Sequence, residues 1–164
     1  MPDYLKYLQN ISSPKTFSRK IGYIKYNFGK FLSFPDPPAT QVLEIGPGLG
    51  ECVHYLNKRG AEQIDIIDND PEIIQYLKTT YRIRNAFQTD NLIRIEKDLG
   101  KYDAIILTQV FEHLSQNNYT PFIKSLYAHL AVNGNIIITV PNGANPLNIG
   151  ERYNDITHQN IFTE

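Results

Sequence analysis

Three closely spaced glycines mark the segment of the chain that is best suited to bind a small ligand. Gly46, Gly48 and Gly50 form a Gly-x-Gly-x-Gly pattern. Pro47 lies inside this pattern, and Glu44 precedes it. Where a strand turns into a helix, glycines let the backbone approach a ligand, and the first helical amides are free to bind it. The carboxylate of Glu44 would repel a pyrophosphate, so it suits a cationic amino acid group instead.

A nicotinamide dinucleotide fits this turn poorly. Its fingerprint, Gly-x-Gly-x-x-Gly, requires a glycine at position 51, where this chain has Glu51. Asp68 and Asn69 end the next apolar segment, and an acid there can hydrogen-bond both hydroxyls of an adenosine ribose. Asp70 precedes Pro71, and we expect it to cap the following helix rather than to contact the ligand.

Two further polar residues follow a short segment that resembles a third strand. Asp90 and Asn91 come shortly after residues 85–87. If that segment is a strand, Asp90 can reach the amino group of an adenine. The alternative is an acid on an ordinary surface loop.

A second group of side chains is suited to acid–base chemistry. Glu112 and His113 follow the apolar segment 102–107, and His158 lies in a polar and aromatic tail. Imidazole accepts protons near neutral pH, so each histidine is a candidate general base or substrate-positioning group. The alternatives are that Glu112 and His113 only shape the helix that follows, and that His158 belongs to a frayed terminus.

The N-terminal part of the chain is expected to form a helical arm. Ser13 before Pro14 predicts a helix start, with serine as the cap and proline in the first turn. The apolar side chains that follow recur at helical spacing: Phe17, Ile21, Ile24, Phe28 and Phe31. Three prolines between positions 35 and 38 end the arm, so residues 1–38 are assigned to it and residues 39–164 to the core. We expect the apolar face to pack on the core; a substrate lid is the alternative.

Strands and helices alternate in the rest of the chain. The predicted strands are residues 42–45, 64–67, 85–87, 102–107 and 135–140. The predicted helices are residues 51–58 and 71–81, and a third that starts near Thr120 and ends near Asn133 and Gly134. This alternation predicts an α/β fold, a Rossmann-like doubly wound and mainly parallel sheet. In such sheets ligands bind outside the carboxyl ends of the strands, where the residues named above would lie.

Residues 40–142 resemble class I S-adenosylmethionine-dependent methyltransferases. The resemblance rests on four segments in the right order: 42–50, 67–68, 103–114 and 130–142. It implies S-adenosyl-L-methionine as cofactor. By this resemblance Glu44, Gly46 and Gly48 border the methionine end of the cofactor, and Asp68 borders its ribose. Asp90 borders the adenine. The methyl group is bordered by the stretch Thr108, Gln109 and Val110.

A competing resemblance concerns the small-RNA 3′-terminal 2′-O-methyltransferases. In that family Glu-x-x-Glu-His and a later histidine bind a divalent metal. This chain has Gln109, Glu112 and His113, with His158 as the candidate fourth ligand. Because Gln109 supplies no charge where the family has a carboxylate, we predict no tightly held metal ion.

The C-terminal segment departs from the usual class I pattern. Its tail is similar to a segment that borders the acceptor site in methyltransferases encoded with bacterial cell-surface polysaccharide genes. The usual antiparallel hairpin beside the last parallel strand is not predicted, so we expect a C-terminally truncated piece of a longer protein; the alternatives are that the tail or a partner covers the edge of that strand. An apolar strand edge left uncovered at residues 136–140 is prone to self-association.

The bulk properties set the remaining expectations. The formal net charge of −1 gives no overall attraction to nucleic acid, although a local basic patch remains compatible with it. The single cysteine rules out an intrachain disulfide and a cysteine-based zinc site. We therefore expect a cytoplasmic protein with no membrane segment.

Methyl transfer from S-adenosylmethionine to a hydroxyl of a small molecule or sugar is the expected function. One alternative is the metal-assisted RNA 3′-terminal reaction. The other is a binding domain that keeps the cofactor fold without turnover.

Overall fold

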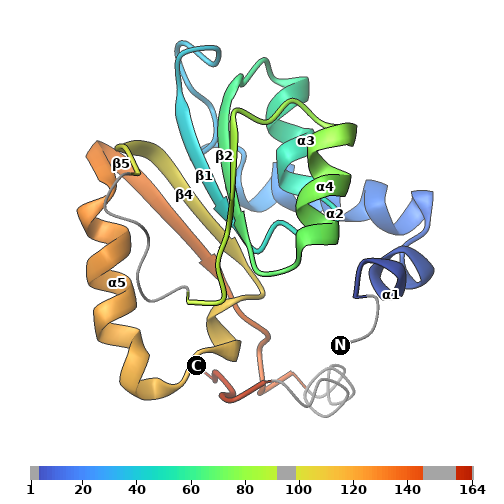
Figure 1. Cartoon of the computed structure of the whole chain (residues 1–164), viewed down its shortest axis with the longest axis vertical. Helices are drawn as coiled ribbons and strands as arrows, with labels where there is room; N and C mark the ends of the chain where they lie inside the picture. The colour runs from blue at the N-terminus through green and yellow to red at the C-terminus, as the bar shows by residue number, and fades with distance from the viewer. Residues whose placement is uncertain (1–3, 92–98, 146–157, 164) are drawn as a thin grey trace.

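The computed structural model describes residues 4–91, 99–145 and 158–163. Its helices are α1 (Tyr4–Ile11), α2 (Pro14–Phe28), α3 (Glu51–Lys58), α4 (Pro71–Thr80) and α5 (Tyr119–Ala128). Its strands are β1 (Gln41–Ile45), β2 (Gln63–Asp68), β3 (Asn85–Gln88), β4 (Tyr102–Thr108) and β5 (Leu130–Thr139). Two short 3-10 turns, η1 (Phe111–His113) and η2 (Gln116–Asn118), lie between β4 and α5. Figure 1 shows the sheet between α5 on one side and α3 and α4 on the other.

The strands form one sheet in the order β3-β2-β1-β4-β5, and every pair is parallel. The chain first moves outward from β1 through β2 to β3, then crosses to β4 and continues to β5. The strand order therefore reverses between β1 and β4, and this is the point where doubly wound sheets bind ligands. The predicted Rossmann-like fold is confirmed.

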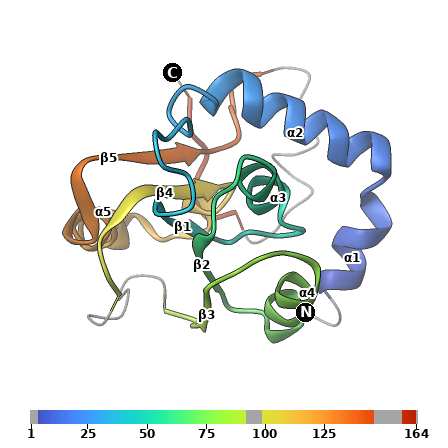
Figure 2. The same cartoon turned by 90° about the horizontal axis from the view of Figure 1, so that it is seen from above.

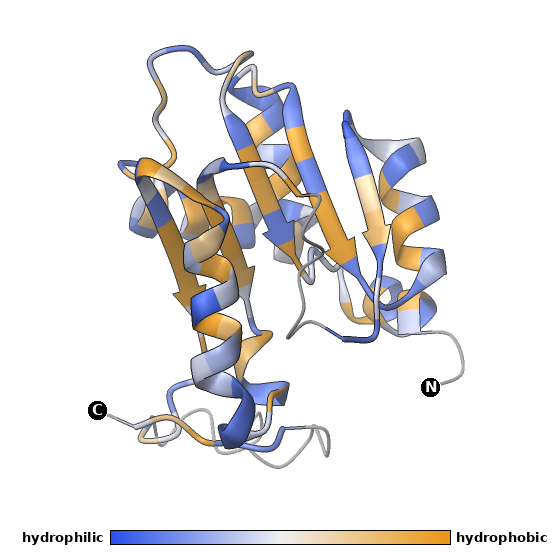
Figure 3. Ribbon diagram, turned by 60° about the vertical axis from the view of Figure 1, so that its left-hand side comes forward, coloured by the Kyte–Doolittle hydropathy of each residue, from blue (hydrophilic) through white to orange (hydrophobic). Residues whose placement is uncertain are grey.

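Successive residues of the central strands pack on opposite faces of the sheet. One core cluster contains Val42, Ile66 and Ile106 together with apolar side chains of α2, α3 and α4. The other contains Leu43 and Ile105, which pack against α5. Because both faces are covered, most strand residues are apolar, and Figure 3 shows orange along the strands with single hydrophilic residues in blue between.

The N-terminal arm packs on the same face as α3 and α4. Ser13 caps α2 as predicted, since its Oγ accepts a hydrogen bond from the amide of Thr16 at 3.1 Å. Ile24 and Leu32 are buried in the core cluster beneath it. Figure 2 shows α2 running past α3, with α1 continuing toward α4. The helix α1 was not predicted.

The boundary between α5 and β5 differs from the prediction. The helix ends at Ala128 rather than near Asn133 and Gly134, and the strand begins at Leu130. Tyr102 pairs with Leu130, yet Ala104 pairs with Asn135, so β5 carries extra residues at an irregularity in the register. Asn133 adopts a φ of 63° there. A β-bulge accommodates turn-forming residues inside a strand, which is why Asn-Gly does not end the helix here.

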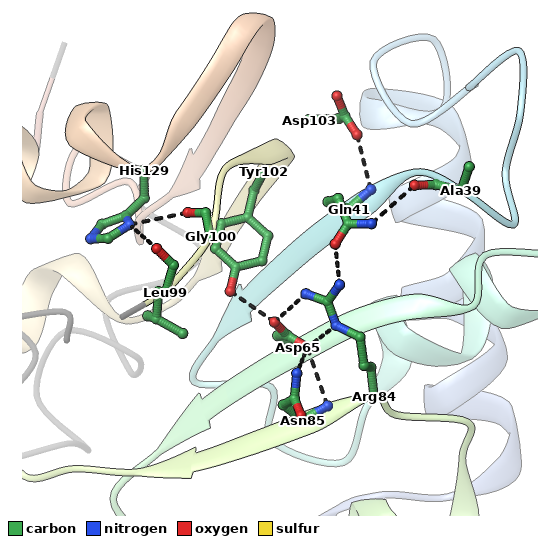
Figure 4. Close-up of polar contacts among 10 residues, drawn as sticks. All are labelled: Ala39, Gln41, Asp65, Arg84, Asn85, Leu99, Gly100, Tyr102, Asp103 and His129. Carbon is green, nitrogen blue, oxygen red and sulfur yellow. Dashed lines mark hydrogen bonds and ion pairs between the residues drawn. The ribbon is translucent and has the colours of Figure 1, made fainter. Parts of the chain in front are cut away.

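The amino ends of four strands are joined by a polar network around Asp65, which is 1% exposed (Figure 4). Arg84 donates to both carboxylate oxygens, at 2.8 and 2.5 Å. The hydroxyl of Tyr102 donates to Oδ2 at 2.8 Å, and Asn85 donates to Oδ1 from its backbone and side-chain nitrogens. Arg84 also bonds to the side chain of Gln41. The network fixes the sheet at the end opposite to the predicted ligand site.

Strand β5 forms one edge of the sheet. Among the described residues no antiparallel strand pairs with its outer side, and the only further pairing is an isolated bridge between Asn142 and Phe162. The described helices include none that is long and apolar enough to cross a membrane.

Candidate active site

The glycine turn lies where β1 leads into α3. Gly46, Gly48 and Gly50 have φ angles of 64°, 54° and 80°, which side chains disfavour. A Cβ at Gly46 would overlap Val110, and one at Gly50 would overlap Leu77. The turn therefore lies tightly between the segment after β4 and helix α4. Pro47 is buried within it, and its carbonyl accepts the amide of Gly50 at 2.9 Å.

Glu44 lies beneath this turn and is 1% exposed. Burial, and then repulsion from Glu51, raises its pKa to about 8, although a hydrogen bond from the backbone of Val53 opposes the shift. Its Oε2 is buried and accepts no hydrogen bond from any described residue. A buried acceptor without a donor is costly, and a cationic group bound at the turn would relieve that cost.

Asp68 ends β2 at the same edge of the sheet and is 7% exposed. Its Oδ1 accepts the amide of Asp70 at 2.9 Å. Burial raises the pKa of Asp68 to about 6 against the opposing effect of that hydrogen bond. Asp70 caps α4 by accepting the amide of Glu72 at 2.8 Å, as predicted. Asn69, between the two acids, is exposed.

The other predicted cofactor residues surround this edge. Asp90 and Asn91 follow β3, and both are exposed. Thr108 ends β4, and Gln109 has a φ of 58° and donates its amide to the carbonyl of Thr139 at 3.0 Å. Val110 is buried against Gly46. The carboxyl ends of all five strands thus lie next to residues that were singled out from the sequence.

The acid–base residues, which are far apart in the sequence, come together after β4. Oε1 of Glu112 lies 3.9 Å from Nε2 of His158. The rings of His113 and His158 meet edge to face, with centroids 4.8 Å apart. One ligand atom from each of these three residues lies within 4.8 Å of the others, a geometry that could hold a metal ion. We call Glu112, His113 and His158 the acid–histidine cluster.

The C-terminal tail is held at this cluster by its backbone. The amides of Gln159 and Asn160 donate to the carbonyl of Glu112 at 2.9 and 3.2 Å. These contacts place His158 on the side of the sheet where the strands end, next to η1. Tyr153, Asp155 and Thr157, which belong to the same polar and aromatic tail, lie outside the described residues.

Comparison with known proteins decides the family. The chain matches the family described as a methyltransferase domain over residues 18–163. The chain belongs to the methyltransferase domain family. Over 41 residues, 25% of the chain, it is 44% identical to ribosomal RNA small subunit methyltransferase A of Cytophaga hutchinsonii, and it covers 16% of that enzyme.

Solved structures show the same fold for this methyltransferase domain. An S-adenosylmethionine-dependent methyltransferase from Archaeoglobus fulgidus superposes with a TM-score of 0.73 at 18% identity, over 90% of this chain and 63% of that one. The methyltransferase domain of bacterial CtHen1-CN gives a TM-score of 0.63 at 21% identity, over 90% of this chain and 77% of that one.

An ion pair between the arm and the glycine turn was not predicted. Lys20 of α2 donates to Glu51, the first residue of α3, at 2.7 Å. Because Lys20 lies one helical turn before the buried Ile24, its spacing does place it on the inward side of the arm. The hydroxyl of Tyr81 also bonds to the turn, at the carbonyl of Leu49, 3.1 Å away.

The rings of Phe111 and Tyr119 beside the acid–histidine cluster were also not predicted as part of the site of this methyltransferase domain, whereas Phe162 belongs to the polar and aromatic tail that was expected there. Phe111 stacks on Tyr119 with centroids 4.4 Å apart, and Phe162 lies 5.8 Å from Phe111. The hydroxyl of Tyr119 is buried and makes no hydrogen bond to a described residue. Burial, followed by the nearby Glu112, raises the pKa of Tyr119. Only the fold brings these rings together.

Proposed function

We propose that this chain transfers a methyl group from S-adenosyl-L-methionine to a hydroxyl oxygen of a small molecule or sugar. The observation that carries the proposal is the acid–histidine cluster, which assembles at the carboxyl end of β4. Val110, which precedes η1, also packs against the glycine turn, so the cluster and the turn belong to one site.

The residues at the turn fit this cofactor. When bound, S-adenosylmethionine supplies a methyl group that its sulfonium makes strongly electrophilic. The buried Oε2 of Glu44 is an acceptor suited to a cationic amino acid group. At Gly48 only a carbon of Leu8 lies within 4 Å of the position that a Cβ would take, so the backbone there is open to close approach. Asp68 at the end of β2 suits the ribose hydroxyls.

The cluster would act on the acceptor. As the hydroxyl oxygen attacks the methyl group, His113 or His158 takes its proton, a role that contributes about 10²–10⁴-fold in rate. Glu112, 3.9 Å from His158, stabilises the imidazolium that forms. Correct alignment of the acceptor supplies much of the remaining rate gain.

The test uses methyl-labelled S-adenosylmethionine and a panel of saccharides, nucleosides and small alcohols. We expect label on an acceptor hydroxyl and a fall of about 10²–10⁴-fold in rate for whichever of His113→Ala and His158→Ala removes the general base. Cofactor affinity should not change in either variant. Gln116→Ala, an exposed substitution on the neighbouring turn η2, is the control and should leave both quantities unchanged.

Three outcomes would contradict the proposal. Full activity in both histidine variants would remove the cluster from the mechanism. Label that appears only on nitrogen or sulfur would show that the acceptor class is wrong. Cofactor binding without turnover on any acceptor would favour the domain that binds without catalysis.

A second candidate is the metal-assisted RNA 3′-terminal 2′-O-methyl transfer. It is favoured by the three ligand atoms within 4.8 Å of one another. The prediction of no tightly held ion stands against it, because Gln109 carries no charge. Elemental analysis of protein purified without chelator decides between the two. A stoichiometric metal that disappears in His113→Ala would promote the RNA reaction.

A further inference from the structure

The charge of the chain is divided unevenly between the arm and the core. Residues 1–38 contain six basic and two acidic residues, whereas residues 39–164 contain ten basic and fifteen acidic residues. The helices α1 and α2 contain no acidic residue at all. The overall charge of −1 is therefore the sum of a basic arm and an acidic core.

The outward side of α2 combines basic and aromatic side chains in one row. Lys15, Arg19, Tyr23 and Tyr26 follow one another at steps of four, four and three residues, which places them on one helical face. This face is opposite to the one that carries the buried Ile24. We call these four residues the basic–aromatic row.

The side chains of the row are open to solvent. Tyr26 is 90% exposed and Tyr23 is 55% exposed. The rings of Tyr23 and Phe28 pack edge to face, with centroids 5.6 Å apart. Lys15 and Arg19 are exposed and form no ion pair with any described residue. Lys20, in contrast, forms an ion pair with Glu51. Gly22, next to the row, has open space where a side chain would be.

We propose that the basic–aromatic row binds a single strand of nucleic acid. Cations neutralise the phosphates, and exposed aromatic rings stack on unpaired bases, which is how single strands are bound without sequence preference. The row spans roughly 16 Å along the helix, enough for two or three nucleotides. This interaction surface goes beyond the proposed methyl transfer and does not depend on the acceptor.

A membrane surface fits the row less well. A helix that lies in a bilayer interface buries a broad apolar face among the lipids. The apolar side chains of α2 that could form such a face, Ile24 among them, pack on the protein core instead. The exposed side chains of the row are two cations and two tyrosines, which suits a polyanion with stacking groups.

The test is fluorescence anisotropy of a labelled dodecauridylate with the full chain, at several salt concentrations. We expect binding at low salt. Lys15→Glu/Arg19→Glu should weaken it by at least about tenfold and lower the slope of log affinity against log salt by about 1.4, the value for two phosphate contacts on a single strand. Tyr23→Ala/Tyr26→Ala should weaken binding by roughly tenfold and leave that slope unchanged.

The control is Lys78→Glu/Lys124→Glu, which makes the same change in charge at exposed sites on α4 and α5. It should affect binding much less than the reversal on α2. Equal loss in the control, no effect of the tyrosine changes, no binding at low salt, or preferential binding to phosphatidylserine vesicles would each overturn the proposal. S-adenosylhomocysteine affinity, measured on every variant, should stay unchanged, which separates this surface from the cofactor site.

Discussion

At the scale of single residues, the candidate site holds two buried carboxyls at the ends of neighbouring strands. Glu44 and Asp68 have pKa values raised to about 8 and about 6, in both cases chiefly by burial. Burial of charge costs stability unless a partner compensates. Oε2 of Glu44 has no donor among the described residues, whereas Asp68 already accepts the amide of Asp70. A cationic group of the cofactor would compensate Glu44, and ribose hydroxyls would add hydrogen bonds to Asp68.

Asp68 should be essential for cofactor affinity. Asp68→Ala removes charge-assisted hydrogen bonds to the ribose, and we expect a loss of about 2 kcal/mol, roughly 30-fold, in S-adenosylhomocysteine affinity by calorimetry. Asp70→Ala is the matched control. It removes a helix cap worth about 1 kcal/mol of folding stability and should leave the affinity unchanged. Equal affinities in wild type and Asp68→Ala would refute the assignment.

Glu44 should make the unliganded protein less stable as the pH rises. Its folded pKa of about 8 lies above its ordinary value of 4.5, so its contribution to stability is complete below pH 4.5 and is lost as the pH approaches 8. Denaturant unfolding between pH 5 and 8 should show the free energy of unfolding falling with pH, less steeply in Glu44→Gln. The same slope in both proteins would contradict this expectation.

The pH dependence of cofactor binding has the opposite direction. Ribose hydroxyls that donate to Asp68 favour its charged form, so binding releases a proton below about pH 6. Affinity for S-adenosylhomocysteine should therefore rise as the pH increases through about 6. Asp68→Asn should abolish this component, and a wild-type affinity that falls over the same range would exclude the contact.

At the scale of elements, the Asp65 network joins the amino ends of four strands. Asp65→Ala leaves Arg84 without its carboxylate, and we expect a loss of about 3 kcal/mol in the free energy of unfolding. The exposed pair of Arg82 and Glu62 is the comparison, and Arg82→Ala should cost less than about 1 kcal/mol. Denaturant titration checks both, and similar losses would show that burial of the network does not matter.

Among the described residues no strand pairs with the outer side of β5, and an open edge there predicts self-association. Ile138 and Val132 on this strand are 36% and 91% exposed, and unpaired strand edges tend to pair with other chains. A lysine at an edge opposes such pairing, so Ile138→Lys should shift sedimentation toward monomer without loss of fold. A wild-type chain that is monomeric at high concentration would contradict the prediction.

The elements of the fold were largely predictable, because their signals are local. The apolar runs around Leu43 and Ile105 and the proline at position 71 locate strands and a helix start within a residue or two. The β5 start was wrong because Asn133 and Gly134 signal a turn, whereas the bulge that absorbs them depends on pairing with β4. Helix α1 was missed because its stability comes from packing of Leu5 and Leu8 on the core.

The parts of the site that depend on a local sequence pattern were predictable. The glycine turn and the cap at Asp70 follow from spacing alone. The contact of His158 with Glu112, the pairing of Lys20 with Glu51, and the stacking of Tyr119 on Phe111 require the chain to fold first. The first two pairs are far apart in the sequence, and the third bridges separate elements, so none of them leaves a periodic signal in a single chain.

At the scale of the whole molecule, the two ends of the parallel strands carry different groups of residues. The Asp65 network lies at the amino ends of the strands, and the glycine turn and the acid–histidine cluster lie at their carboxyl ends. The arm touches the latter end, since Leu8 of α1 lies 3.9 Å from where a Cβ on Gly48 would be. The buried network that stabilises the sheet and the candidate active site thus lie at opposite ends of the strands.

We propose that this sheet binds S-adenosylmethionine at the glycine turn. Isothermal titration of the purified chain with S-adenosylmethionine, S-adenosylhomocysteine and NAD tests it most directly. We expect saturable binding of the first two at one site per chain and no binding of NAD. Binding of NAD without binding of either adenosyl compound would contradict it.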